Sequence, residues 1–285
     1  MSAATLRPPA GAGELGSWLH AVAAEVLVRL EAAVEGRDGL GVEAKLGPQD
    51  LVTTADREME AWLFEAVSAS YPDDGFLGEE GGWRRGPTGR RDWVVDPIDG
   101  TANFVSGLPW SCCSIGLVEG GEPVAGLVVE SSRHDVFLTS GRRSPSALND
   151  IPVTVAQDPA LAGKVVLLEI PAGAPPSVLD AVERAVRHDG GSVRVLGAAA
   201  LALAAVAAGR AHAAVLAAPS PWDIAAGVAL VRHAGGVVLD LGGPYDLSRG
   251  GPVIAGNEQV AHRLQAAARD GGLEHLTQVG LGALR

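Results

Sequence analysis

Residues 93–104 read WVVDPIDGTANF and form the most informative stretch of the chain. An apolar run predicts a buried strand that ends at Asp96. Pro97 predicts a turn, Asp99 follows it at once, and Gly100 and Thr101 open what reads as a short helix. We therefore expect two carboxylates close together at a strand end, beside helix-terminal N–H groups suited to an anion. Taken alone, however, the pattern D-x-x-D-G is more often an ordinary turn in which the second aspartate caps a helix.

Further acidic residues stand where predicted helices begin or strands end. Asp56 lies at a helix start, Glu79 and Glu80 follow a short apolar strand, and Asp223 lies at the start of another helix. Carboxylates about 4 Å apart repel by roughly 4 kcal/mol per pair at an effective dielectric constant of about 20. A divalent cation removes that cost, and oxygen-only ligands favour Mg²⁺, Mn²⁺ or Ca²⁺ over zinc.

The composition is that of a globular protein. The 285 residues are 47% hydrophobic and 20% charged, which suffices for one large domain or two modest ones. The net charge of −12 argues against a nucleic-acid partner, which needs a basic surface. The longest Ala-rich apolar run, from Ala198 to Ala208, is far shorter than the roughly 20 residues of a membrane span. Two adjacent cysteines, Cys112 and Cys113, read as buried thiols in a reducing cytoplasm.

The order of predicted elements indicates an α/β protein in two halves. Residues 1–150 read as an α+β half, with helices over 14–35 and from Thr54, a Gly-rich loop between them that includes Gly47 and Pro48, and strands over 76–77, 93–95, 113–118, 124–129 and 136–138. Residues 151–285 read as an α/β half: strand 165–168, helix 177–187, strand 193–196, helix 198–208, strand 213–216, helix 222–233, strands 237–239 and 253–254, and a helix from Glu258. Because no Pro/Gly/Ser linker separates the halves, we expect them to share an interface.

The sequence resembles the inositol monophosphatase family of metal-dependent, lithium-sensitive phosphatases. Three blocks carry the resemblance in the family's order: residues 50–56 with 78–80, residues 96–104, and residues 222–227 with 234–236. They cover nearly the whole chain, and the central block is highly specific. The resemblance implies a layered αβαβα sandwich of the inositol monophosphatase/fructose-bisphosphatase type, with the site where the two halves meet. The family is often dimeric, so we expect a cytoplasmic homodimer.

The resemblance also implies roles for individual residues. The metal ligands would be the backbone carbonyl of Ile98 and four carboxylates, those of Glu79, Asp96, Asp99 and Asp223. Asp56 and Thr101 would be catalytic, positioning and helping to deprotonate a water molecule. The substrate and its phosphate would be bound by the Gly100 and Thr101 amides, by Lys45 on a loop, and by Ala199.

The implied cofactor is Mg²⁺, in two or three ions, with Mn²⁺ as a possible substitute. A phosphate monoester is an anion, so this acidic cluster needs metal before it can admit one. Two ions about 4 Å apart activate the attacking water and neutralise the leaving alkoxide of an in-line displacement. The expected partner is therefore a small phosphorylated metabolite, with neither nucleic acid nor membrane involved.

The substrate is less well specified by the sequence. Inositol phosphatases typically carry an acid seven residues before the last aspartate, where this chain has Leu216, and the family's Gly-Thr-Ala becomes Gly197-Ala198-Ala199. Fewer polar contacts weaken the case for an inositol phosphate. We expect a small sugar, polyol or amino-alcohol phosphate. Histidinol-phosphate phosphatase, a nucleotide 3′-phosphatase, a fructose-bisphosphatase-like enzyme and a non-catalytic metal- or phosphate-binding module remain alternatives.

Overall fold

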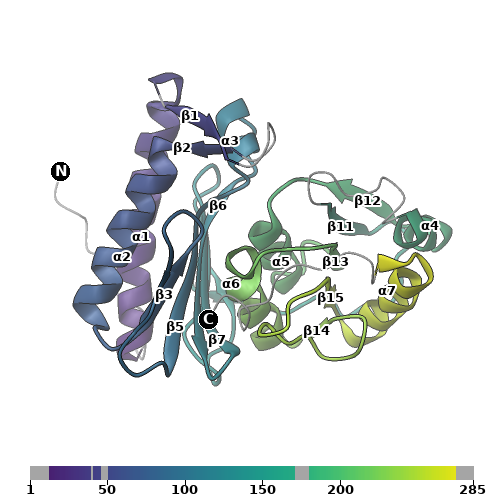
Figure 1. Cartoon of the computed structure of the whole chain (residues 1–285). Coiled ribbons are helices and arrows are strands. Elements are labelled where there is room, and N and C mark those ends of the chain that lie inside the picture. The colour runs from purple at the N-terminus through teal and green to yellow at the C-terminus, as the bar shows by residue number, and fades with distance from the viewer. Residues whose placement is uncertain (1–12, 40, 46–50, 171–179, 274–285) are drawn as a thin grey trace.

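The computed structural model describes residues 13–39, 41–45, 51–170 and 180–273, and it has five layers. Helices α1 (Glu14–Glu35) and α2 (Thr54–Ser70) cover one face of an eight-stranded sheet (Figure 1). Helices α5 (Ala199–Ala207) and α6 (Pro221–His233) lie between that sheet and a five-stranded one. Helices α4 (Asp180–His188) and α7 (Glu258–Asp270) cover the outer face. This order confirms the expected αβαβα sandwich.

The eight-stranded sheet has the order β10-β9-β8-β7-β6-β5-β3-β4. Its strands are β3 (Gly75–Gly78), β4 (Gly82–Arg84), β5 (Arg91–Asp99), β6 (Cys112–Glu119), β7 (Glu122–Glu130), β8 (Asp135–Thr139), β9 (Ala147–Leu148) and β10 (Ile151–Pro152). Only the β3–β5 pair is parallel within this sheet. Strand β5 is buried from Asp92 to Asp99, because helices cover both faces of the sheet.

The middle layer is apolar because it contacts a sheet on either side. Every residue of α5 from Ala200 to Ala207 is buried. Helix α6 approaches strands β6 and β7 closely at two glycines, Gly116 and Gly126, which face each other across the strand pair. A Cβ atom at Gly126 would lie 2.4 Å from the carbonyl oxygen of Ala226 in α6. Small residues on both elements therefore set how closely α6 packs on this sheet.

The second sheet has the order β12-β11-β13-β15-β14. It comprises β11 (Val165–Glu169), β12 (Ser192–Val195), β13 (Ala213–Leu216), β14 (Val237–Leu239) and β15 (Val253–Gly256). Strands β12, β11 and β13 run parallel to one another, whereas β15 is antiparallel to both of its neighbours. The alternating strands and helices predicted for this part of the chain are confirmed.

The structure corrects two local predictions. Pro97 does not end the strand: β5 continues to Asp99, and its register with β6 shifts between Asp96 and Asp99. The stretch between α1 and α2 is not only a loop, because β1 (Val42–Ala44) pairs with β2 (Leu51–Thr53). Gly47 and Pro48, and the first residues of the helix expected over 177–187, lie outside the described residues.

Two other features match expectation. Cys112 and Cys113 are both free and buried. No helix among the described residues is long and apolar enough to cross a membrane. The division of the chain at residue 150 remains a prediction.

Candidate functional site

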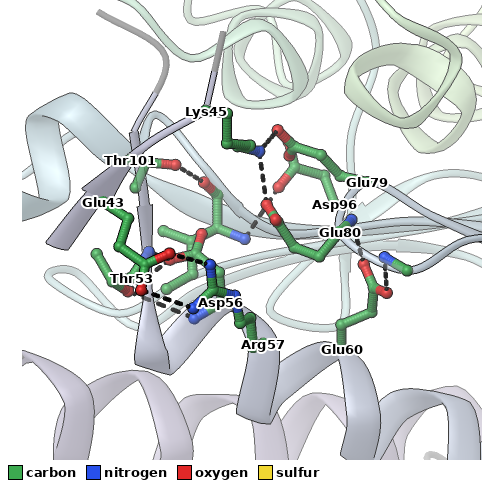
Figure 2. Close-up of polar contacts among 12 residues, drawn as sticks. Glu43, Lys45, Thr53, Asp56, Arg57, Glu60, Glu79, Glu80, Asp96 and Thr101 are labelled. Carbon is green, nitrogen blue, oxygen red and sulfur yellow. Dashed lines mark hydrogen bonds and ion pairs between the residues drawn. The ribbon is translucent and has the colours of Figure 1, made fainter. Parts of the chain in front are cut away.

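The structure brings the predicted acidic residues together where the eight-stranded sheet meets the middle layer. Burial raises the pKa of Asp96 well above its ordinary value, and so do four neighbouring carboxylates: Glu79, Asp99, Asp223 and Asp56. Figure 2 shows Glu79 beside Asp96, with Asp56 and Thr101 in the same region. The side chains therefore converge from β5, from the turn after β3, and from the first turns of α2 and α6.

Two of these acids also cap the helices that carry them. Asp56 Oδ2 accepts a hydrogen bond of 2.8 Å from the Thr53 amide at the start of α2. Asp223 Oδ2 accepts one of 2.7 Å from the Ser220 amide at the start of α6. Each cap engages one carboxylate oxygen, and Asp56 Oδ1 is buried with no hydrogen-bond partner. Capping thus fixes both side chains without using all of their oxygen atoms.

The irregular end of β5 positions the central motif. Asp96 Oδ1 accepts from the Ile98 amide at 2.9 Å, and the Thr101 hydroxyl donates to the Ile98 carbonyl at 2.9 Å. Gly100 then adopts a left-handed conformation with φ of +84° before α3 (Thr101–Ser106) begins. A Cβ atom at Gly100 would lie 2.9 Å from the Trp110 carbonyl oxygen. The register shift between Asp96 and Asp99 and the left-handed conformation of Gly100 together redirect the chain. The polar groups of this segment therefore face the same region.

Asp99 joins the sheet to the middle layer. Its Oδ1 accepts from the Ala199 amide at 3.2 Å and its Oδ2 from the Ala200 amide at 2.7 Å. Ala199, predicted to bind substrate, thus donates its amide to Asp99 in this structure. Burial raises the pKa of Asp99 to about 7, against the opposing effect of these amides.

Lys45 provides a cation within the cluster. Its Nζ lies 2.7 Å from Glu79 Oε1 and 2.7 Å from Glu80 Oε1 (Figure 2). Burial acts to lower the pKa of Lys45, but the two carboxylates raise it above its ordinary value. Lys45, predicted to bind substrate, thus lies beside Glu79 and Glu80, and its role in binding stays a prediction.

The donor set fits a hard divalent cation. It consists of carboxylates and the Ile98 carbonyl, and such oxygen donors suit Mg²⁺, Mn²⁺ or Ca²⁺. Asp56 Oδ1 has no partner, and Asp96 and Asp99 are buried, so the ionised forms of these carboxylates are costly unless a cation binds them. As the described side chains stand, no three His, Cys, Asp or Glu residues are arranged to hold an ion. Lys45 bonds one oxygen atom of Glu79, and backbone amides bond both oxygen atoms of Asp99 and one of Asp223.

A cleft of about 310 Å³ opens beside the cluster. Its first wall includes Glu79, Asp99, Gly100, Thr101 and Asp223. The second wall comes from the second sheet and the chain that follows its strands, and it includes Glu169, Ile170 and the segment from Leu216 to Pro219. No Lys, Arg or His is among the described residues that line it, so an anionic ligand needs a bound cation to enter.

Sequence reasoning missed Glu60, a buried residue of α2. Its carboxylate accepts from the Glu80 amide at 2.7 Å and from the Gly81 amide at 2.6 Å, which holds the turn that carries Glu79 (Figure 2). A Cβ atom at Gly78 would lie 2.3 Å from this carboxyl group, so the strand leaves space for it. A single acid within a helix gives no sequence signal for such a role.

Replacing Glu60 with glutamine is expected to weaken binding of Mg²⁺ to the site by roughly tenfold to a hundredfold. Glutamine offers one acceptor oxygen to two amides, so the turn that positions Glu79 loses one of its two hydrogen bonds. Calorimetric titration with Mg²⁺ measures the change, and the exposed Glu65→Gln on the same helix is the control. Equal affinity in Glu60→Gln and Glu65→Gln would show that Glu60 does not position the ligand.

Comparison with known proteins gives a consistent result. A sequence model described as "Inositol monophosphatase family" matches residues 17–273. An inositol-1-monophosphatase of Mesorhizobium japonicum is 38% identical over 226 residues, which are 78% of this chain and 84% of that protein. The Nus factor SuhB of Xylella fastidiosa is 39% identical over 230 residues, 76% of this chain and 80% of that protein. The crystal structure of extragenic suppressor protein suhB from Bartonella henselae superposes with a TM-score of 0.85 at 33% identity, covering 91% of this chain and all of that one.

Proposed function

Since the chain belongs to the inositol monophosphatase family of phosphoric monoester hydrolases, we propose that it hydrolyses the phosphate ester of a small sugar, polyol or amino alcohol with Mg²⁺ as cofactor. One observation carries the proposal: carboxylates from the sheet and from the middle layer, the buried Asp99 and the half-buried Glu79 and Asp223, line a cleft whose described lining has no basic side chain. That arrangement suits an anionic substrate only with cations between the protein and the phosphate.

We assign the cation ligands to Glu79, Asp96, Asp99 and Asp223 and to the Ile98 carbonyl, in two or three Mg²⁺ positions. When bound, Mg²⁺ neutralises phosphate charge and lowers the pKa of water. Mn²⁺ offers the same preference for oxygen ligands.

We assign proton transfer to Asp56, with Thr101 as its positioning partner. Burial raises the pKa of Asp56 to about 6, so this carboxylate is a stronger base than an ordinary aspartate. Its Oδ1 has no hydrogen-bond partner and would accept the proton of the attacking water. The Thr101 hydroxyl, fixed on the Ile98 carbonyl, would orient that water.

The phosphate would lie against the amides of Gly100 and Thr101, which follow β5 directly. Lys45 would leave Glu79 and Glu80 as cations bind and would contact a phosphate oxygen. The apolar side chains near Leu216 and Ile170 favour a substrate with fewer hydroxyl groups than a fully hydroxylated ring.

The test is phosphate release from a panel of small esters, with Mg²⁺, without it, and with Li⁺ added. The panel includes myo-inositol 1-phosphate, histidinol phosphate, a nucleoside 3′-phosphate and fructose 1,6-bisphosphate. We expect Mg²⁺-dependent, Li⁺-sensitive release from a few esters, with inositol phosphate not dominant. Dominant activity on inositol phosphate would contradict the inference drawn from Leu216, and no release from any ester would favour a non-catalytic binding role.

We further propose a cytoplasmic homodimer. The buried free thiols of Cys112 and Cys113 suit a reducing compartment, and dimers are common in the family. Sedimentation at several protein concentrations tests the assembly.

A further inference from the structure

Glu169 differs chemically from its neighbours in the cleft. The cleft has five polar side chains among its described lining residues, and four of them already have assigned roles: Glu79, Asp99, Thr101 and Asp223. The fifth is Glu169, the last residue of β11, which the proposed cation set does not include. Its neighbours along the lining, Ile170 and the segment from Leu216 to Pro219, have apolar side chains.

The two carboxylate oxygens of Glu169 have different surroundings. Oε2 accepts a hydrogen bond of 2.9 Å from the Gly197 amide, and this bond lies at the solvent-exposed side. Oε1 is buried and has no hydrogen-bond partner. Oε2 is therefore the oxygen that a molecule in the cleft can reach. A carboxylate oxygen has two lone pairs, and Gly197 uses one, so Oε2 can accept a second donor.

The position of this carboxylate is fixed before a ligand arrives. Gly197 precedes α5, whose first amides bond Asp99, so Glu169 and Asp99 are held by the same short segment. Burial raises the pKa of Glu169 to about 7 and the charge of Asp99 adds to this effect, against the opposing effect of the Gly197, Leu196 and Ala198 amides. A hydrogen-bond donor supplied by a ligand would offset the cost of keeping this group ionised.

We propose that Glu169 is a specificity-determining residue, which accepts at Oε2 a hydrogen bond from a hydroxyl or protonated amine on the alcohol part of the substrate. This inference rests on the proposed phosphatase function, since it names the part of the ester that the second wall recognises. It assigns the phosphate to the first wall and the donor group of the alcohol to Glu169. An apolar alcohol would leave the carboxylate without this partner.

The test uses three esters of equal chain length: propyl phosphate, 3-hydroxypropyl phosphate and 3-aminopropyl phosphate. With Mg²⁺, the wild-type kcat/KM for the two donor esters should exceed that for propyl phosphate by roughly tenfold to a hundredfold. Glu169→Ala should remove this preference, because kcat/KM for the two donor esters falls to that for propyl phosphate. Glu169→Gln should turn its amide oxygen to Gly197 and its NH₂ group to the ligand, so the ammonium ester loses its advantage while the hydroxyl ester keeps most of it.

The pattern across the three esters separates recognition from structure. If Glu169 only stabilises the segment before α5, both variants will lower kcat/KM for all three esters by the same factor, and the inference is overturned. Equal wild-type kcat/KM values for all three esters would also overturn the inference about Glu169, although the proposed phosphatase function would stand. A wild type that hydrolyses no ester in the larger panel instead contradicts the proposed function itself. Glu119→Gln, an exposed substitution at the end of β6, serves as the control.

Discussion

Asp99→Asn is expected to abolish turnover, with kcat/KM falling by roughly a thousandfold or more. The substitution keeps the side-chain volume but removes one negative charge from the proposed cation ligands. Asp99 lines the cleft and is 7% exposed, so water cannot readily replace the lost ligand. The fold should survive, because asparagine retains one acceptor for the Ala199 and Ala200 amides. Phosphate release with Mg²⁺ measures the effect, and circular dichroism checks the fold.

A matched substitution separates the site from general charge effects. Asp270→Asn removes the same charge at the exposed end of α7 and should leave turnover unchanged. If Asp99→Asn is unfolded even with Mg²⁺ present, Asp99 is structural rather than a ligand. Retention of more than about a tenth of wild-type turnover would likewise remove Asp99 from the proposed ligands, since losing a ligand should cost more than losing a residue that only orients one.

Gly126→Ala is expected to lower the free energy of unfolding by about 3 kcal/mol. The added methyl group would stand 2.4 Å from the Ala226 carbonyl oxygen, an atom of the α6 backbone that cannot move alone. Its cross-strand partner Gly116 is similarly confined, with a Cβ position 2.6 Å from the Ala225 side chain. Helix α6 must therefore move away from the sheet. Urea unfolding, with and without the substitution, measures the loss.

The control for this substitution is Gly243→Ala. A Cβ atom at Gly243 would meet nothing within 4 Å, so the free energy of unfolding should change by less than about 0.5 kcal/mol. Because α6 carries Asp223, Gly126→Ala should also weaken Mg²⁺ binding. Unaltered stability would show that the sheet and the helix adjust without cost, contrary to close packing at this contact.

Local patterns in the sequence predicted those elements whose signals lie within a few residues. The spacing of six apolar residues predicts the inner face of α1: Leu15, Trp18, Leu19, Val22, Val26 and Leu30. The last four are buried, and Leu15 and Trp18 are half-buried. The continuation of β5 past Pro97 could not be read in this way, since it depends on the register with β6. The β1–β2 pair is likewise defined by strand pairing rather than by composition.

The same distinction applies to the site. Asp56, Asp96, Asp99 and Asp223 stand at element ends within recognisable blocks, so the sequence could name them. Glu60 and Glu169 acquire their roles from the amides of Glu80, Gly81 and Gly197, which only the tertiary fold brings to them. For Glu169 a signal did exist, because this acid, like Glu79, directly follows an apolar strand run.

The placement of Asp223 on α6 and of Asp96 and Asp99 on β5 has a thermodynamic consequence. An ion held between them would be a non-covalent cross-link from the sheet to the middle layer. Any ligand that binds only the folded chain stabilises it, by about 2.7 kcal/mol at a concentration one hundred times its dissociation constant. The concentration of Mg²⁺ would thus determine how strongly this contact stabilises the fold. A chelator would lower the stability of the contact between the sheet and the middle layer, and it would prevent the proposed hydrolysis as well.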